Sequence, residues 1–180
     1  MVNITVTNGV TASDIGRVVG SARGKGIVTL YDTNNEKLCT IEAWSNGGAI
    51  GRIIRLQNEY YISVIKNRSG STMHIYNLAC ELVTKKKLSP KLHPRRMDVG
   101  EIFNRKTSQE IVVAAHRGKG VCLKVIHYNP KTDTWRTLKR KYIINIPEEK
   151  YKIEVKRKTD TVLIKNKYTG KVYYKWVLAK

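Results

Sequence analysis

Short hydrophobic runs alternate with polar turns along most of the chain, and one arrangement of runs and turns recurs. Residues 110–128, EIVVAAHRGKGVCLKVIHY, contain an apolar run, the turn Arg-Gly-Lys-Gly, and a second run that ends in an aromatic residue. Residues 17–31, RVVGSARGKGIVTLY, repeat this order with the same four-residue turn. Runs of this length, rich in Val and Ile and bounded by turn residues, predict pairs of antiparallel strands.

Two weaker copies extend the pattern to the whole chain. They cover residues 60–76, with a turn at Asn67-Arg68-Ser69-Gly70, and residues 151–168, with a turn at Lys158-Thr159-Asp160. Turns at positions 23, 68, 117 and 158 are separated by 45, 49 and 41 residues. This period is typical of propeller blades. We therefore predict one domain with four repeats, at about 1–46, 47–90, 91–140 and 141–180.

Each repeat has room for about four short strands, and sustained helical periodicity is missing. The predicted fold is all-β, a small β-propeller of four four-stranded blades that closes as a monomer. The alternative is half of an eight-bladed propeller, completed by dimerisation with a second copy. Residues 2–6 alternate and predict a first strand, which either fastens the last blade or begins the first.

Positive charge is the most unusual property of the composition. Lys and Arg number 34 against 14 Asp and Glu, a formal net charge of +20, and residues 91–180 carry +15 of it. Such an excess predicts a polyanionic partner, which is nucleic acid, an acidic glycan or an anionic membrane surface. A requirement for solubility produces the same balance, so charge alone does not decide.

The polar turns of the four repeats give the predicted binding site. If the turns are equivalent, their basic side chains emerge on one face of the ring and attract phosphates in a salt-dependent way. Solvated hairpin tips also tolerate basic residues, which is the simpler interpretation. The predicted polyanion-binding residues are Arg23, Lys25, Arg68, Arg117, Lys119, Lys156, Arg157 and Lys158.

Two further basic clusters lie outside these turns. One comprises Lys85 to Lys87 with Lys91, Arg95 and Arg96, and the other comprises Arg136, Lys139, Arg140 and Lys141. Aromatic residues near such clusters can stack on bases. Packing between blades is the favoured role for the tryptophans Trp44, Trp135 and Trp176.

Catalytic, cofactor and metal sites are not predicted. The four histidines stand at no metal-ligand spacing, and no nucleophile or dinucleotide motif is present. Both Arg-Gly-Lys-Gly turns are followed by strand-like runs, whereas a phosphate loop leads into a helix. We therefore expect a non-catalytic protein without cofactor.

Cysteine usage and hydropathy give an expectation for location. Cys39, Cys80 and Cys122 are odd in number, widely spaced and within apolar runs, which favours buried free thiols. No run approaches the length needed to cross a bilayer. We expect a soluble intracellular protein.

The third repeat resembles a known family. Asp98-Val99-Gly100, a polar loop, EIVVAAHRGKG, a second strand to Tyr128, and Asn129-Pro130-Lys131-Thr132 are similar to the FG-GAP or VCBS type of β-propeller repeat. The resemblance implies a propeller fold. Calcium-binding members carry oxygen ligands at alternating positions of the loop, and the loop of this chain departs from that pattern, so a calcium site is not expected.

These observations predict a binding module. A basic face of the propeller would engage nucleic acid or another polyanion. The alternative is a scaffold for protein interaction that docks an acidic partner, with the charge setting the association rate.

Overall fold

A computed structural model of the chain describes residues 12–66, 72–88, 94–103, 106–147, 150–156 and 159–178. Over these ranges the chain forms four antiparallel sheets and one 3-10 turn, η1 (Ala12–Asp14). The prediction of an all-β protein is therefore confirmed. The described residues form no closed barrel or closed propeller.

Each sheet is a meander in which strands consecutive in sequence pair side by side. The first sheet contains β1 (Ile15–Gly20), β2 (Gly26–Asp32) and β3 (Lys37–Trp44), and the second contains β4 (Ala49–Leu56), β5 (Glu59–Lys66), β6 (Thr72–Tyr76) and β7 (Leu82–Lys87). The third contains β8 (Pro94–Gly100), β9 (Glu110–Arg117), β10 (Gly120–Asn129) and β11 (Thr134–Ile144), and the fourth contains β12 (Tyr151–Lys156), β13 (Thr161–Asn166) and β14 (Val172–Val177).

The number of strands differs from the prediction at the two ends of the chain. The second and third sheets have the four strands expected, whereas the first and fourth have three each among the described residues. The strand expected over residues 2–6 lies outside the described ranges. The repeat boundary predicted between residues 140 and 141 is wrong, because β11 continues through it. An edge strand keeps its charged side chains in water, so the run Lys139-Arg140-Lys141 does not end it.

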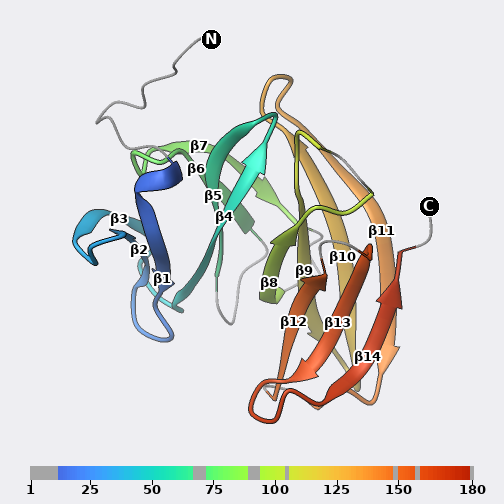
Figure 1. Ribbon diagram of the computed structural model, residues 1–180. Coiled ribbons are helices and arrows are strands. Elements are labelled where there is room, and N and C mark those ends of the chain that lie inside the picture. Colours follow the sequence, from blue (N-terminus) through green and yellow to red (C-terminus); the bar gives the residue numbers. More distant parts are fainter. Residues whose placement is uncertain are drawn as a thin grey trace.

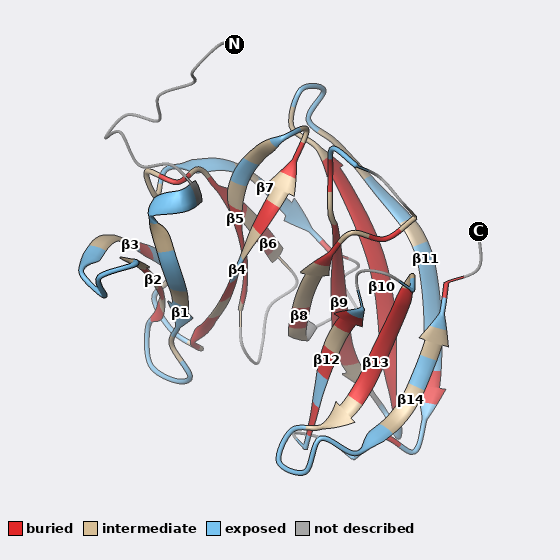
Figure 2. Ribbon diagram, in the orientation of Figure 1, coloured by how far each residue is buried: buried red, intermediate tan, exposed pale blue. Residues whose placement is uncertain are grey.

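The four sheets stand in a row and bury three hydrophobic cores between them. Figure 1 shows the first sheet, in blue, and the fourth, in orange and red, on opposite sides of the two central sheets. Val28 and Ile62 belong to the core between the first two sheets, Ile54 and Ile111 to the next core, and Leu123 with neighbouring side chains to the last. Among the described residues, no core joins the first sheet to the fourth. In Figure 2 the buried residues concentrate in inner strands such as β9, β10 and β13.

The first strands of the last three sheets run in the same direction. The Arg96 side chain on β8 donates a hydrogen bond to the Tyr151 carbonyl at the start of β12, 3.0 Å away. The Val155 amide near the end of β12 donates to Asp98, further along β8, at 2.8 Å. Strands β8 and β12 are therefore parallel, and each sheet has one end at which its first strand starts and an opposite end at which it stops.

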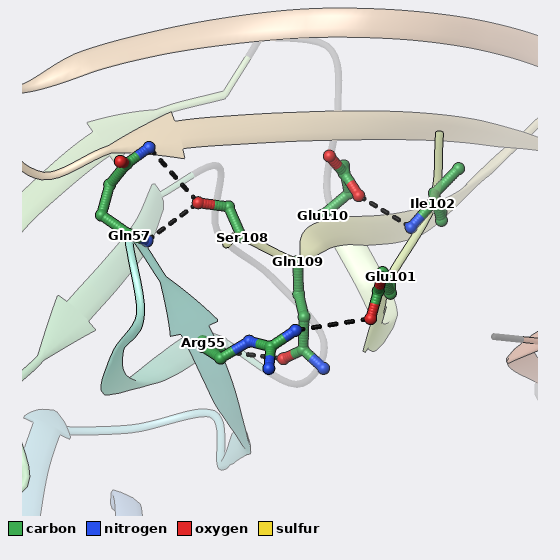
Figure 3. Close-up of polar contacts among 7 residues, drawn as sticks. All are labelled: Arg55, Gln57, Glu101, Ile102, Ser108, Gln109 and Glu110. Carbon is green, nitrogen blue, oxygen red and sulfur yellow. Dashed lines mark hydrogen bonds and ion pairs between the residues drawn. The ribbon is translucent and has the colours of Figure 1, made fainter. Parts of the chain in front are cut away.

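A polar brace joins the second and third sheets where β4 and β8 end. The Arg55 amide donates to the side-chain oxygen of Gln109, and the Gln109 amide donates to the Arg55 carbonyl at 2.7 Å. The Arg55 guanidinium also lies 3.4 Å from Glu101, and the Gln57 amide donates to the Ser108 hydroxyl at 2.8 Å (Figure 3). Backbone and side-chain groups thereby fix the angle between the two central sheets.

A disulfide corrects the expectation of three free thiols. Cys39 on β3 is bonded to Cys80 in the turn that follows β6, and the two cysteines are 41 residues apart. They come from different sheets, so their spacing in sequence carried no sign of the bond. Cys122 is the buried free thiol that was expected. Disulfides persist in oxidising compartments, so an intracellular location stays a prediction.

The described ranges contain no helix that is long and apolar enough to span a membrane.

Candidate polyanion site

The last strands of the two central sheets carry dense positive charge. Strand β7 ends in three exposed lysines, and the exposed residues of β11 include Arg136, Lys139, Arg140 and Lys141. Both strands lie at the edge of their sheet. Figure 2 shows much of β11 in pale blue, the colour of exposed residues. Charge on an edge strand prevents pairing with another chain, and this is its simplest role. The geometry between the two edges indicates a further role.

Strand register directs one lysine of β10 into the gap between the second and third sheets. Cys122 and Ile126 belong to the core between these sheets, whereas Leu123 and Val125 belong to the core beyond. Because side chains alternate between the faces of a strand, Lys124 points to the same side as Cys122 and Ile126. Strand β10 therefore supplies a cation to the gap.

Two more cations face Lys124 from neighbouring strands. Arg140 on β11 is the direct partner of Lys124 in the strand pairing, and cross-strand partners share a face. On β7, Lys86 pairs with Met73, which belongs to the core between the second and third sheets. Lys86 therefore points into this gap from the opposite side.

Lys124 and Lys86 line a half-open hollow of about 190 Å³, which we call the basic hollow. Side chains that line it come from both central sheets and include apolar as well as basic residues: Lys86, Lys87, Leu88, Lys124, Ile126, Trp135, Arg136 and Thr137. Lys124 is the least exposed of the basic residues that line it, since only 6% of it is accessible.

The Trp135 ring, which lines the basic hollow, packs against a second aromatic ring. Trp135 stacks on Tyr128 with ring centroids 4.4 Å apart. The Tyr128 hydroxyl donates a hydrogen bond to Asp133 at 3.0 Å, and burial together with this contact raises the pKa of Tyr128 to about 12. Tyr128 therefore stays neutral at ordinary pH and fixes the indole plane without adding charge.

Lys124 has an unfavourable environment for a charged amine. Burial lowers the pKa of Lys124, and the nearby Arg140 charge lowers it further. Among the side chains that the structure describes, no carboxylate forms an ion pair with Lys124. Buried charges in proteins are normally paired. A bound anion would supply the missing charge.

The sequence-predicted site residues do not lie on one face. Arg23 and Lys25 are exposed in the turn between β1 and β2, and hydrogen bonds from Gly48 and Ala49 place this turn beside the start of β4. Lys119 is exposed in the turn between β9 and β10, at the end of the third sheet where β8 starts. Both turns therefore lie at the sheet ends where the first strands of the second and third sheets start.

The turn of the fourth repeat lies at the opposite end of the sheets, where the first strands β8 and β12 stop. Lys156 is the last residue of β12, level with the end of β8, and forms an ion pair with Glu154 at 2.6 Å. Together with Lys165, it lowers the pKa of Glu154 to about 2. The expectation of four equivalent turns fails here because β12 is the first strand of its sheet, while β9 is the second strand of its own.

Three of the predicted residues, Arg68, Arg157 and Lys158, lie outside the described ranges, and only the backbone of Arg117 is described. What the sequence analysis missed is Lys124. Its signal was a single lysine in the otherwise apolar run GVCLKVIHY. The two basic clusters around residues 85–87 and 136–141 were recognised separately, and the fold brings them to either side of one hollow.

Within the described ranges, no three His, Cys, Asp or Glu side chains gather closely enough to hold a metal ion. No protein-family model matches the chain, and no curated protein matches it either.

Proposed function

We propose that the protein is a non-catalytic binding module that engages nucleic acid through the basic hollow and the basic edge strands on either side of it. The observation that carries the proposal is the largely buried Lys124, which lines the hollow together with Lys86, Lys87 and Arg136 and forms no ion pair with a carboxylate among the described side chains. Positive charges gathered without a carboxylate lower the stability of the ligand-free protein. Bound phosphate groups would offset this loss of stability.

The surroundings of the hollow suit a nucleic acid strand better than a small anion alone. Basic residues continue along β11 beyond the hollow, and Tyr142 on the same strand is about half exposed. Cations that follow a backbone, together with aromatic rings that stack on bases, are how single strands are bound without sequence readout. Trp135 supplies a second ring at the hollow itself.

We also propose that the four sheets are blades of a propeller-like arc. Support comes from the meander in every sheet and from the first strands of neighbouring sheets, which lie next to one another. β1 is antiparallel to β4, so the first sheet corresponds to the second to fourth strands of a blade. The β9–β10 hairpin is the unit on which a relation to FG-GAP and VCBS repeats rests.

Between the two assemblies considered for such an arc, the outer face of the fourth sheet favours the monomer. By register this face presents Lys152, Glu154, Lys165 and Lys175 among fewer apolar residues, Leu163, Val172 and Val177. Repeat arrays end in polar faces of this kind when nothing further packs on them. Light scattering should give a mass near 20.5 kDa. A mass of twice that value would favour an eight-bladed ring made of two copies.

The binding proposal is tested by fluorescence anisotropy of labelled single-stranded and duplex DNA and RNA across a salt series, with heparin as competitor. We expect single strands to bind at physiological salt, with an affinity that falls steeply as salt rises. If heparin at the same concentration of negative charge displaced the nucleic acid, the interaction would be a nonspecific attraction between opposite charges. No binding to any nucleic acid at low salt would overturn the proposal and favour a scaffold for an acidic protein.

A further inference from the structure

The last strand of the fourth sheet, β14, has an edge with little charge. Within the described ranges it pairs with β13 on one side and with no strand on the other, which we call the free edge. Its sequence VYYKWV contains one charged residue, whereas the last strands of the other sheets contain two in β3, three in β7 and four in β11. Charge on an edge strand prevents its N–H and C=O groups from pairing with another chain. β14 has the least of this protection.

The order of the strands leaves a place beside the free edge. The second and third sheets each end in a fourth strand, and β7 pairs antiparallel with β6 as β11 does with β10. Among the described residues, the fourth sheet stops at its third strand. A strand added antiparallel to β14 would occupy the place of β7 and β11 and would pair with the backbone groups of the free edge.

Apolar side chains of β14 would be covered by such a strand. Tyr174 and Trp176 pack, partly buried, against the core between the third and fourth sheets. On the other face, Val172 is 46% and Val177 is 57% exposed. Because neighbours across two paired strands pack together, apolar residues at alternate positions of an added strand would extend one of these faces.

Exposed lysines lie on both sides of the same place. Lys171 immediately precedes β14, and Lys175 lies within it. On β11, Lys139 and Lys141 pair with β10 residues of the core shared with the fourth sheet, so both point towards that sheet. None of these four lysines forms an ion pair with a carboxylate that the structure describes.

The charge indicates the kind of partner. Residues 150–178 contain nine Lys and Arg against two Asp and Glu, a net charge of +7. A second copy that paired through its own β14 would bring two such sheets together, and like charges on paired strands are destabilising. Carboxylates would instead pair with the lysines. A nucleic acid would also be attracted, but it has no peptide groups with which to continue the sheet.

We propose that the free edge of β14 is a docking site for an extended acidic segment of another protein, which adds to the fourth sheet as an antiparallel fourth strand. Carboxylates of the segment would lie beside Lys171 and Lys175, and its apolar side chains beside Tyr174 and Trp176. The basic hollow lies between the second and third sheets, so this site is separate from it. The inference goes beyond the proposed function and does not depend on it.

The test is fluorescence anisotropy of a labelled peptide, about ten residues long, in which glutamate alternates with valine. One control peptide is methylated at its backbone nitrogens, and another has lysine in place of glutamate. At physiological salt we expect the acidic peptide to bind about tenfold more tightly than its methylated form, which lacks the donors that pair with a strand. Equal binding of these two peptides, or no binding of the acidic one, would overturn the inference.

Matched substitutions locate the peptide on the fourth sheet. Lys175→Glu reverses a charge on β14 and should weaken binding of the acidic peptide about tenfold, because like charges then face each other. Lys152→Glu makes the same change on β12, at the other edge of the same face, and should stay within about twofold of wild type. Equal losses would show that the peptide responds to overall charge and would overturn the assignment.

Hydrogen exchange in the wild-type protein needs no variant. The backbone amides of residues 172–177 should exchange more slowly when the acidic peptide is bound. Slower exchange in β7 or β11 instead would overturn the inference. A protein dimer that the peptide dissociates would assign the free edge to a second copy, and displacement of the peptide by a single-stranded oligonucleotide at equal charge concentration would assign it to nucleic acid.

The outcomes also separate this inference from the proposed function. If the acidic peptide binds and no nucleic acid does, the inference stands and the proposed function fails. If nucleic acid binds and the acidic peptide does not, the proposed function stands and the inference fails.

Discussion

Lys124 on β10 and Arg140 on β11 are direct partners across the two strands, so two positive charges lie side by side on one face of the third sheet. Like charges in this position destabilise a sheet. The cost is larger for Lys124, because only 6% of it is exposed. This repulsion between positive charges lies beside the basic hollow, where a bound anion would offset it.

Replacing Lys124 by methionine should therefore stabilise the free protein. Removing the unpaired buried charge should raise the free energy of unfolding by about 1 to 3 kcal/mol at pH 7. Burial lowers the folded-state pKa of Lys124 below its ordinary value of 10.5. The penalty is thus complete below the lowered pKa and is lost as pH rises towards 10.5, so the gain should shrink at alkaline pH.

Urea denaturation of wild type and Lys124→Met at neutral and alkaline pH measures this effect. Lys141→Met, an exposed neighbour on β11, should stay within about 0.5 kcal/mol of wild type. A Lys124→Met protein less stable than wild type at pH 7 would show that the amine has a stabilising partner.

Neutralising the hollow should lower the salt dependence of nucleic acid binding. Each lysine or arginine that contacts phosphate contributes roughly 0.7 to the slope of log affinity against log salt for a single strand. The double variant Lys86→Gln, Arg136→Gln removes two cations that line the hollow, so it should bind more weakly and lose about 1.4 from the slope. Anisotropy titrations at four salt concentrations give both quantities.

The control for this measurement is Lys25→Gln with Lys119→Gln, which removes the same charge from two exposed turns. If the turns are solvated tips, this variant should change the slope by much less. If the turn variant lowered the slope more than the hollow variant did, the binding site would lie at the turns, as expected from the sequence, and not at the hollow.

Breaking the link between the first two sheets should cost considerable stability. The Cys39–Cys80 bond closes a loop with a separation of 41 residues, for which the chain-entropy model gives about 4 kcal/mol. The double variant Cys39→Ser, Cys80→Ser should lower the free energy of unfolding by roughly that amount. A reducing agent should destabilise wild type and leave the double variant unchanged, and equal responses from both proteins would contradict the prediction.

A glycine sets the distance between the third and fourth sheets. A Cβ atom added at Gly100 on β8 would lie 2.4 Å from a methyl carbon of Val155 on β12. Gly100→Ala should therefore destabilise the protein by about 1 to 3 kcal/mol, because the packed core cannot shift freely. Adding Val155→Ala should recover part of the loss, and strictly additive effects in the thermal melts of the four proteins would contradict this account.

The sequence was most informative where a turn and two flanking runs were local to one stretch. The β9–β10 and β1–β2 hairpins follow from their Arg-Gly-Lys-Gly turns, and the all-β class follows from the short runs. The repeat boundary predicted between residues 140 and 141 falls within β11, in a run of lysine and arginine. In the fold these side chains point to solvent from an edge strand, where charge is tolerated.

The site depended on relations between distant segments, which periodicity does not reveal. That Lys156 and Lys119 lie at opposite ends follows from the position of β12 as first strand of its sheet. Lys86 and Lys124 line one hollow because the second and third sheets lie side by side around a shared core. The pairing of Cys39 with Cys80 likewise depends on contact between two sheets.

The position of the basic hollow has a mechanical consequence. It straddles the joint between the second and third sheets, which is the middle joint of the row, on the side away from the brace around Arg55 and Gln109. A ligand seated there would touch both central sheets and join them at the edges opposite the brace. Occupancy of the hollow would then hold the angle between these two sheets from both sides, so the two sheets would resist separation more strongly with the ligand than without it.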